Sequence, residues 1–288
     1  MQPASSSSRS TSLKRGIGRA FTYATVGAWS LFTVFFVVWI VIASLKKTRD
    51  LFSEPWSLPL KPVWGNYVKT WVSSHFGDYF LNSLWVVSIS VCMLLVVCVP
   101  AAYVLARARF RGREALANFF ILGMGVPIPL LFVPLVVIMT TLRMGDSLSG
   151  LSVVYVALSV PFTIYVLMGF FASLPGEIES AAIIDGCSDF QTFWHVMMPL
   201  AMPGIATVAI LNFVGLWNEY QLSLVLINSP ENRTLSLGIY SLISSMQYSG
   251  GDWPGLFAGI TIVMVPTIIM FVAMSERMIS GITMGGVK

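Results

Sequence analysis

Residues 80–106 read FLNSLWVVSISVCMLLVVCVPAAYVLA, a run of apolar and small polar side chains without a single Asp, Glu, Lys or Arg. A hydrocarbon core about 30 Å thick is crossed by a helix of about 20 such residues. Lipid offers no hydrogen-bond partners, so a backbone inside it must satisfy its own polar groups, as a helix does. The run therefore predicts a transmembrane α-helix.

Five further runs of the same kind occur along the chain. Only the fifth run of the six contains an ionisable residue, Glu219. The six runs are residues 21–45, 80–106, 115–142, 150–172, 203–227 and 255–275. The composition agrees, because 56% of the 288 residues are hydrophobic and 10% are charged, against about a quarter charged in soluble proteins. We predict an all-α membrane protein with six transmembrane helices.

The segments outside these runs predict the domain organisation and the orientation. Residues 1–20 are polar and Ser-rich and are expected to be a disordered tail, followed by a six-helix domain over 21–275 and a second tail over 276–288. An even number of spans puts both termini on one side. With the termini inside, ten Lys and Arg lie inside and seven outside, which favours cytoplasmic termini although Lys46, Lys47 and Arg49 fall outside.

Several classes of function fit the sequence poorly. A transporter driven by protons or sodium keeps ionisable residues within its spans, and five of the six runs have none. ATP hydrolysis by a P-loop needs a Gly-Lys pair, which does not occur in the sequence. Two distant histidines and three cysteines without metal-ligand spacing provide neither a catalytic triad nor a metal site. The modest charge of +4 calls for no nucleic-acid partner. We therefore expect neither a catalytic residue nor a cofactor in this chain.

The stretch between the fourth and fifth runs is the most informative one. Residues 175–204 read PGEIESAAIIDGCSDFQTFWHVMMPLAMPG, with four acidic residues and no Lys or Arg. Pro175 suits a helix start and Gly186 a helix end. Ser188 and Gln191 form a capping-box pattern for a second short helix, with an apolar face on Phe190, Phe193 and other residues. Two short helices at an angle predict either a plug for a partner's groove or a hairpin on the lipid surface.

This stretch resembles the "EAA" coupling loop of the permeases of binding-protein-dependent ABC importers. That pattern is Glu-Ala-Ala, three residues and Gly, and then, after about nine further residues, a hydrophobic residue and Pro. Ser180 stands where the family usually has Glu, and Glu179 lies one place earlier. The matching residues are Ala181, Ala182, Asp185, Gly186, Pro199 and Pro203. The stretches 217–220, 233–235 and 281–288 resemble the maltose-type branch of the family.

The resemblance implies a type I importer permease of a bacterial inner membrane, taking up a sugar or oligosaccharide. It implies a second permease subunit, two ATPase subunits that bind ATP and Mg²⁺, and an extracellular sugar-binding protein. The coupling loop, placed at 173–202, would dock on the ATPase. Its expected contact residues are Glu179, Ser180, Ala181, Ala182, Asp185, Gly186, Phe190, Phe193 and Pro199.

Two further groups of residues receive expected roles. The resemblance implies that the C-terminal residues Gly285, Gly286, Val287 and Lys288 touch the ATPase. Asn218 and Glu219 are candidates for lining the pathway or a gate, with packing as the alternative, because an ionisable residue within a span is a functional candidate. An importer of another solute, such as an amino acid, phosphate or a peptide, and a scaffold or channel without ATPase coupling remain as alternatives.

Overall fold

The computed structural model describes residues 6–249 and 251–286, and these residues contain helices and loops without a β-strand. Two compact units make up the chain. The first comprises the residues up to Thr70 together with Asp252–Thr261, and the second comprises Trp71–Gly251 and the residues from Ile262 on. Within the described residues, five helices are long and apolar enough to cross a membrane, and a bent helix pair supplies a sixth crossing if it counts as one span.

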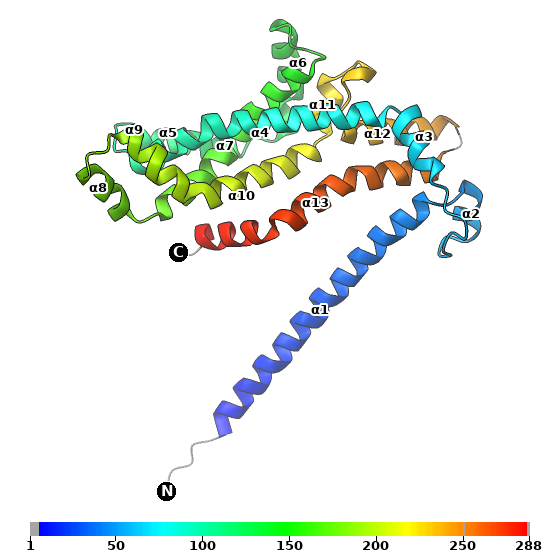
Figure 1. Ribbon diagram of the computed structural model, residues 1–288, viewed down its shortest axis with the longest axis horizontal. Coiled ribbons are helices and arrows are strands. Elements are labelled where there is room, and N and C mark those ends of the chain that lie inside the picture. Colours follow the sequence, from blue (N-terminus) through cyan, green and yellow to red (C-terminus); the bar gives the residue numbers. More distant parts are fainter. Residues whose placement is uncertain (1–5, 250, 287–288) are drawn as a thin grey trace. The chain divides into compact units, whose positions relative to one another are not determined.

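The first unit is built on α1 (Ser6–Ser44), α2 (Thr48–Ser53) and most of α3 (Gly65–Ser73), labelled in Figure 1. Residues 6–20, expected to be a disordered tail, are helical and form the first turns of α1. Lys46 is buried and donates from Nζ to the carbonyl oxygens of Glu54 and Pro55, at 2.8 and 3.1 Å. Its charge is therefore bound within the fold, which explains how a lysine that ran against the predicted charge bias is accommodated.

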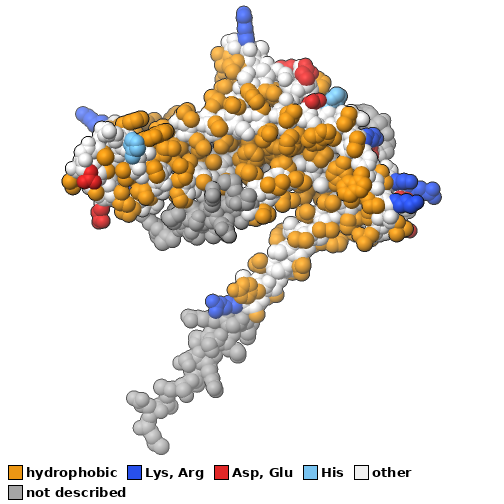
Figure 2. Space-filling model, in the orientation of Figure 1, with side chains coloured by type: hydrophobic (Ala, Val, Ile, Leu, Met, Phe, Trp, Pro, Cys, Tyr) orange, Lys and Arg blue, Asp and Glu red, His pale blue; other side chains and the backbone are white. Residues whose placement is uncertain are grey.

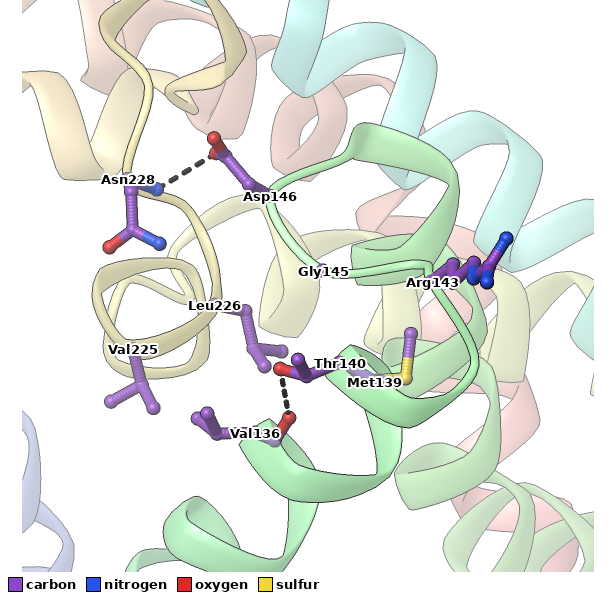
Figure 3. A pocket seen from close by; sticks show the side chains of 9 residues that line it. All are labelled: Val136, Met139, Thr140, Arg143, Gly145, Asp146, Val225, Leu226 and Asn228. Atoms are coloured by element: carbon purple, nitrogen blue, oxygen red, sulfur yellow. Dashed lines mark hydrogen bonds between the residues drawn. The ribbon is translucent and has the colours of Figure 1, made fainter.

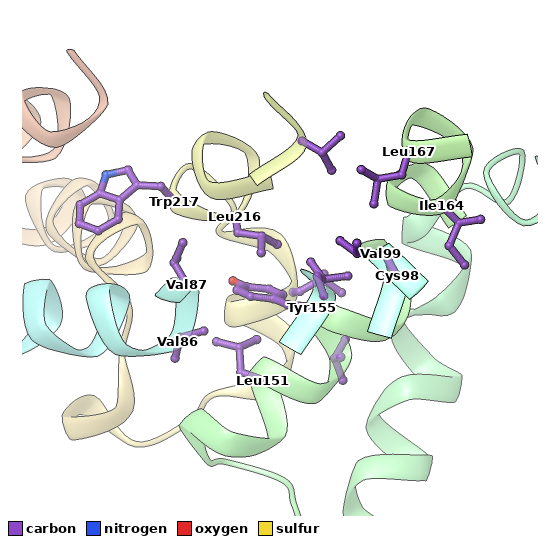
Figure 4. Packing of buried hydrophobic residues seen from close by; sticks show 14 of the residues in the cluster. Val86, Val87, Cys98, Val99, Leu151, Tyr155, Ile164, Leu167, Leu216 and Trp217 are labelled. Carbon is purple, nitrogen blue, oxygen red and sulfur yellow. The ribbon is translucent and has the colours of Figure 1, made fainter. Parts of the chain in front are cut away.

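The second unit is a helical bundle around α4 (Phe76–Arg107) and α7 (Leu148–Ser173). The two helices pack along one another, and α10 (Met198–Trp217) packs against both. Figure 4 shows side chains of this core, among them Val99 of α4, Leu167 of α7 and Leu216 of α10. At Gly204 of α10 a Cβ atom would lie 2.4 Å from the Phe170 ring. Only glycine lets α10 approach α7 this closely.

The third apolar run is not a straight span. It forms α5 (Arg113–Gly123), a 3₁₀ turn η1 (Ile128–Leu131) and α6 (Phe132–Thr141), with a bend of 94° between the two parts. Pro127 is the N-cap of η1, and Pro129 lies inside it. Because proline removes a backbone donor and disfavours a helix before it, the prolines account for the break.

The segment after α10 brings several short helices together. These are α11 (Gln221–Leu226), the 3₁₀ turn η3 (Pro230–Asn232) and α12 (Leu235–Ser249), followed by α13 (Trp253–Gly286), which passes from the first unit into the second. The Trp217 indole donates to the Val263 carbonyl at 3.2 Å, which ties the end of α10 to α13. Figure 2 shows hydrophobic side chains along the body of the second unit and charged ones mainly at its extremities, as expected for a bundle that lies in lipid.

Candidate functional site

The segment between α7 and α10 begins with the short helix α8 (Gly176–Ile184), as the sequence predicted. The helix is capped by Asp185 and followed by Gly186, whose φ is +86°. The Gly186 N–H donates to the Ile183 carbonyl and the Cys187 N–H to the Ala182 carbonyl, both at 3.0 Å. This pair of bonds defines a Schellman motif, in which glycine occupies the left-handed position. The predicted helix end at Gly186 is confirmed.

The next turn is held by the capping box that the sequence predicted. The Gln191 N–H donates to the Ser188 hydroxyl, and the Ser188 N–H donates to the Gln191 side-chain oxygen at 2.9 Å. A separate second helix does not follow. The turn α9 (Asp189–Gln191) runs through the π-helix η2 (Thr192–Met197) into α10, so that one helical stretch extends from Asp189 to Trp217. The fifth span thus begins well before residue 203, where the apolar run predicted it.

The π-helical turn has a local cause in Pro199. A proline cannot donate to the carbonyl four residues earlier, and its ring collides with that carbonyl, which here belongs to His195. In the wider turn the Met198 N–H instead donates to the carbonyl of Phe193, five residues back. The widening gives the Pro199 ring room without ending the helix. The loop is thereby joined to the membrane helix through a continuous but irregular segment.

One side of this segment packs onto its own bundle. Phe193 is 8% exposed, and its ring centroid lies 5.0 Å from that of Tyr103 on α4. Tyr103 also contacts Phe171 of α7. Ala182 is buried as well, where α8 packs against η2. Phe193 and Ala182, expected to meet a partner, therefore face the interior of this chain.

A polar cluster ties α8 to the end of α4. The Tyr103 hydroxyl donates to Glu179 Oε1 at 2.7 Å. The Arg107 guanidinium lies with Nε 3.6 Å from Glu179 Oε2, and it donates to the Leu174 carbonyl. The Arg107 and Glu179 side chains are only 14% and 23% exposed. The carboxylate of Glu179 thus points into its own chain.

The opposite side of the segment exposes large apolar side chains, which we call the coupling surface: Ile183, Ile184, Phe190 and Trp194. Ile184 is 84% exposed and Phe190 72%. The Phe190 and Trp194 rings stack at 6.4 Å with an interplanar angle of 7°. Ser180, Ala181, Asp185 and Pro199 are also exposed. These side chains are suited to insert into an apolar groove of a partner protein. The acidic residues around them suit an anionic lipid surface poorly.

The structure places Glu219 outside the fifth span, in the break between α10 and α11. Glu219 Oε2 accepts a hydrogen bond from the Tyr155 hydroxyl at 2.6 Å, and Oε1 accepts from the Leu222 N–H at 2.7 Å. Asn218 is exposed and donates to the Val214 carbonyl of its own helix. Glu219 therefore connects α7 to the first turn of α11, and the two neighbours do not form a joint site.

The C-terminal candidates are only partly described. Gly285 and Gly286 end α13, so the region expected to be a tail from residue 276 is helical up to Gly286. Val287 and Lys288 lie outside the described residues.

The sequence analysis did not identify three residues that connect the helices at this end of α4. Tyr103 gave no signal, because it is one apolar-run residue among many, and Arg107 counted only as one of the ten Lys and Arg expected on the inside. Arg113 was interpreted in the same way, yet its guanidinium donates to the carbonyl oxygens of Leu105 and Ala106 in the last turn of α4. A basic side chain at a helix C-terminus suits the helix dipole, and this placement could have been predicted.

Asp146 organises the loop at the end of the bundle that carries α11. Its carboxylate accepts from the N–H groups of Asn228 and Ser229 and from the Ser229 hydroxyl at 2.5 Å. The Ser229 hydroxyl is the largest of the contacts that hold the pKa of the Asp146 carboxyl below its ordinary value. A pocket of about 350 Å³ lies between α6 and α11. Asp146 and Asn228 are two of the residues that line it (Figure 3). Asp146 thus fixes a loop rather than offering a free carboxylate.

Comparison with known proteins identifies the family. Residues 98–279 match the family described as "Binding-protein-dependent transport system inner membrane component". The diacetylchitobiose uptake system permease protein NgcG of Streptomyces coelicolor is 35% identical over 92% of this chain and 88% of that protein. The sulfoquinovosyl glycerol transport system permease protein SmoH of Agrobacterium fabrum is 34% identical over 88% of this chain and 89% of that protein.

A solved structure has the same fold. A chain of a bacterial ABC transporter involved in the import of the acidic polysaccharide alginate superposes with a TM-score of 0.77 at 22% identity, covering 96% of this chain and 99% of that chain. The match over residues 98–279 and the two relatives establish that the protein belongs to the inner-membrane components of binding-protein-dependent transport systems and is a multi-pass permease subunit.

Proposed function

We propose that this permease subunit forms part of an ATP-driven importer of a sugar or oligosaccharide. Two relatives that align along most of the chain are named for the uptake of diacetylchitobiose and of sulfoquinovosyl glycerol. Both solutes contain a sugar. The chain would work with a second permease subunit, two ATPase subunits that bind ATP and Mg²⁺, and an extracellular binding protein that delivers the solute. It would need no cofactor of its own.

The observation that supports coupling to an ATPase is the coupling surface. Ile184 and Phe190 are 84% and 72% exposed in the segment that connects α7 to α10. Burial of such side chains contributes roughly 1.5–3 kcal/mol each. A partner with an apolar groove would gain this free energy, so we assign the surface to the ATPase. The proposal places both termini in the cytoplasm, on the side of the ATPase. The C-terminal residues Gly285–Lys288 would then reach the same partner.

The mechanism is an exchange between two states of the bundle. ATP closes the ATPase dimer and moves the coupling surface with it. Because η2 joins this surface to α10 without a break, the movement reaches the membrane helices. The bundle opens outward, accepts the solute from the binding protein, and releases it inside after hydrolysis.

The test is transport by the whole complex in proteoliposomes. We expect uptake of a labelled oligosaccharide that requires ATP, the ATPase subunit and the binding protein. Phe190→Asp should abolish ATPase binding and uptake. Phe52→Asp is the matched control, since Phe52 is 64% exposed in α2 of the other unit, and it should retain ATPase binding. Uptake that continues without the ATPase would refute the proposal.

A further inference from the structure

Glu179 is the acidic residue of α8 whose charge is turned away from the coupling surface. It accepts from the Tyr103 hydroxyl at 2.7 Å and faces the Arg107 guanidinium. Ser180, which stands at the position of the family's glutamate, is exposed and donates to the Gly176 carbonyl of its own helix at 3.1 Å. At the position of Ser180, α8 therefore offers no carboxylate to a partner, and the adjacent carboxylate of Glu179 binds α4.

The helix α8 is connected to the bundle in several ways. Its N-terminal end follows α7 directly through Leu174 and Pro175. Its C-terminal end passes through the Schellman turn at Gly186 into the continuous helix from Asp189 to Trp217, and α8 also packs against η2 of that helix. The polar cluster of Tyr103, Arg107 and Glu179 connects α8 to a different helix, because it holds α8 to the last two turns of α4.

The cluster also contains an unsatisfied donor. Arg107 Nε is buried and has no hydrogen-bond partner, although Glu179 Oε2 lies 3.6 Å away. A buried donor without a partner is unfavourable, and a slightly closer approach of the two side chains would satisfy it. The ion pair therefore favours a short distance between α4 and α8.

We propose that Tyr103, Arg107 and Glu179 form a latch that passes the movement of α8 to α4, in addition to the route through η2 into α10. This inference rests on the proposed coupling to an ATPase. Glu179 is a positioning residue, since it acts through α4 and touches neither nucleotide nor solute. Without the latch, the movement of α8 no longer reaches α4, and ATP hydrolysis proceeds without moving that helix.

The test uses the complete transporter in proteoliposomes and measures ATP hydrolysed per solute imported. Tyr103→Phe removes one hydroxyl and keeps the ring contacts with Phe193 and Phe171. Because the lost hydrogen bond is made to a charged group, we expect the ratio to rise about tenfold or more. Glu179→Gln should raise it similarly. The double variant should be no worse than the worse single variant, because both changes break the same contact.

Tyr165→Phe on α7 is the matched control, because Tyr165 is 51% exposed, and its ratio should stay at the wild-type value. A second measurement does not depend on transport. Hydrogen exchange of the α8 amides in the assembled complex should rise in Tyr103→Phe and Glu179→Gln, while that of the α7 amides stays unchanged.

The outcomes separate the two proposals. If the wild type transports and the variants keep both the wild-type ratio and the wild-type exchange of α8, the latch is wrong and the proposed function stands. If the two single variants raise the ratio and their effects add fully, the residues act separately and the latch is also wrong. If the wild-type complex shows no ATP-dependent uptake, the proposed function fails, and the latch fails with it.

Discussion

The turn at Gly186 allows a graded test of how the coupling surface is positioned. Gly186 has a φ of +86°, and a Cβ atom added there would meet nothing within 4 Å. A substitution therefore acts through backbone strain alone and not through a clash. A left-handed conformation costs an ordinary residue about 1–2 kcal/mol, and Asn pays less because it visits this region more readily.

The magnitudes differ enough to be ranked. For Gly186→Ala, about 1–2 kcal/mol lowers the ratio of the native turn to alternative conformations about 5–30-fold. Gly186→Asn should retain most of the native turn. Gly186→Pro fixes φ near −65° and also removes the N–H that donates to the Ile183 carbonyl, at a cost of about 3 kcal/mol or more. We expect the order Gly, Asn, Ala, Pro in solute-stimulated ATP hydrolysis and in uptake.

The assay compares these variants in proteoliposomes at equal amounts of assembled complex. Assembly is checked by co-purification of the second permease, because a variant that fails to assemble says nothing about coupling. Equal activity of the Pro variant and the wild type would show that the Schellman turn does not position the coupling surface. A loss as large with Asn as with Ala would show that left-handed strain is not the cause.

Three further predictions concern other contacts. Gly204→Ala should destabilise the bundle by about 1–3 kcal/mol, since its Cβ would lie 2.4 Å from the Phe170 ring; thermal unfolding in detergent should show the loss and a partial recovery on adding Phe170→Leu. Asp146→Ala should speed amide exchange at Ser229. Because the folded pKa of Asp146 is lowered, the stabilising effect is present above the unfolded pKa of about 3.9 and disappears as pH falls through the lower folded pKa, so wild type and variant should converge there. Ser180→Glu restores the family's residue at an exposed position and should bind the ATPase at least as tightly in a pull-down titration; weaker binding would contradict the predicted position of the coupling surface.

The apolar runs predicted most of the membrane helices, because a helix surrounded by lipid needs apolar side chains along its whole length. The runs at 80–106 and 150–172 correspond closely to α4 and α7. The bend of 94° in the third run was signalled by its prolines, although its size was not. Local turn chemistry was equally readable, as the capping box at Ser188 shows.

The contacts of Glu179 could not be predicted in the same way. Glu179 and Tyr103 are 76 residues apart in the chain, and a sequence contains no information on which turn of α4 faces α8. The periodicity that placed Phe190 and Phe193 on one apolar face was wrong in this respect, because Phe193 packs on the chain's own core and Phe190 lies on the opposite, exposed side. Phe190 and Phe193 share the pattern, and only Phe190 is exposed.

Glu219 shows why an apolar run can conceal a break. Residues 203–227 look like one span because the side chains on both sides of Glu219 are apolar, yet the helix ends at Trp217 and resumes at Gln221. The Glu219 carboxylate accepts hydrogen bonds from the Leu222 N–H and the Tyr155 hydroxyl. It thereby provides a partner for a backbone N–H that the break between the helices leaves without one. A carboxylate bound in this way would have to release both partners before it could meet a solute. Its position therefore favours the packing interpretation of Glu219 over a gate. The break between α10 and α11 is thus a second place, besides the contact of Glu179 with α4, where a carboxylate connects two helices.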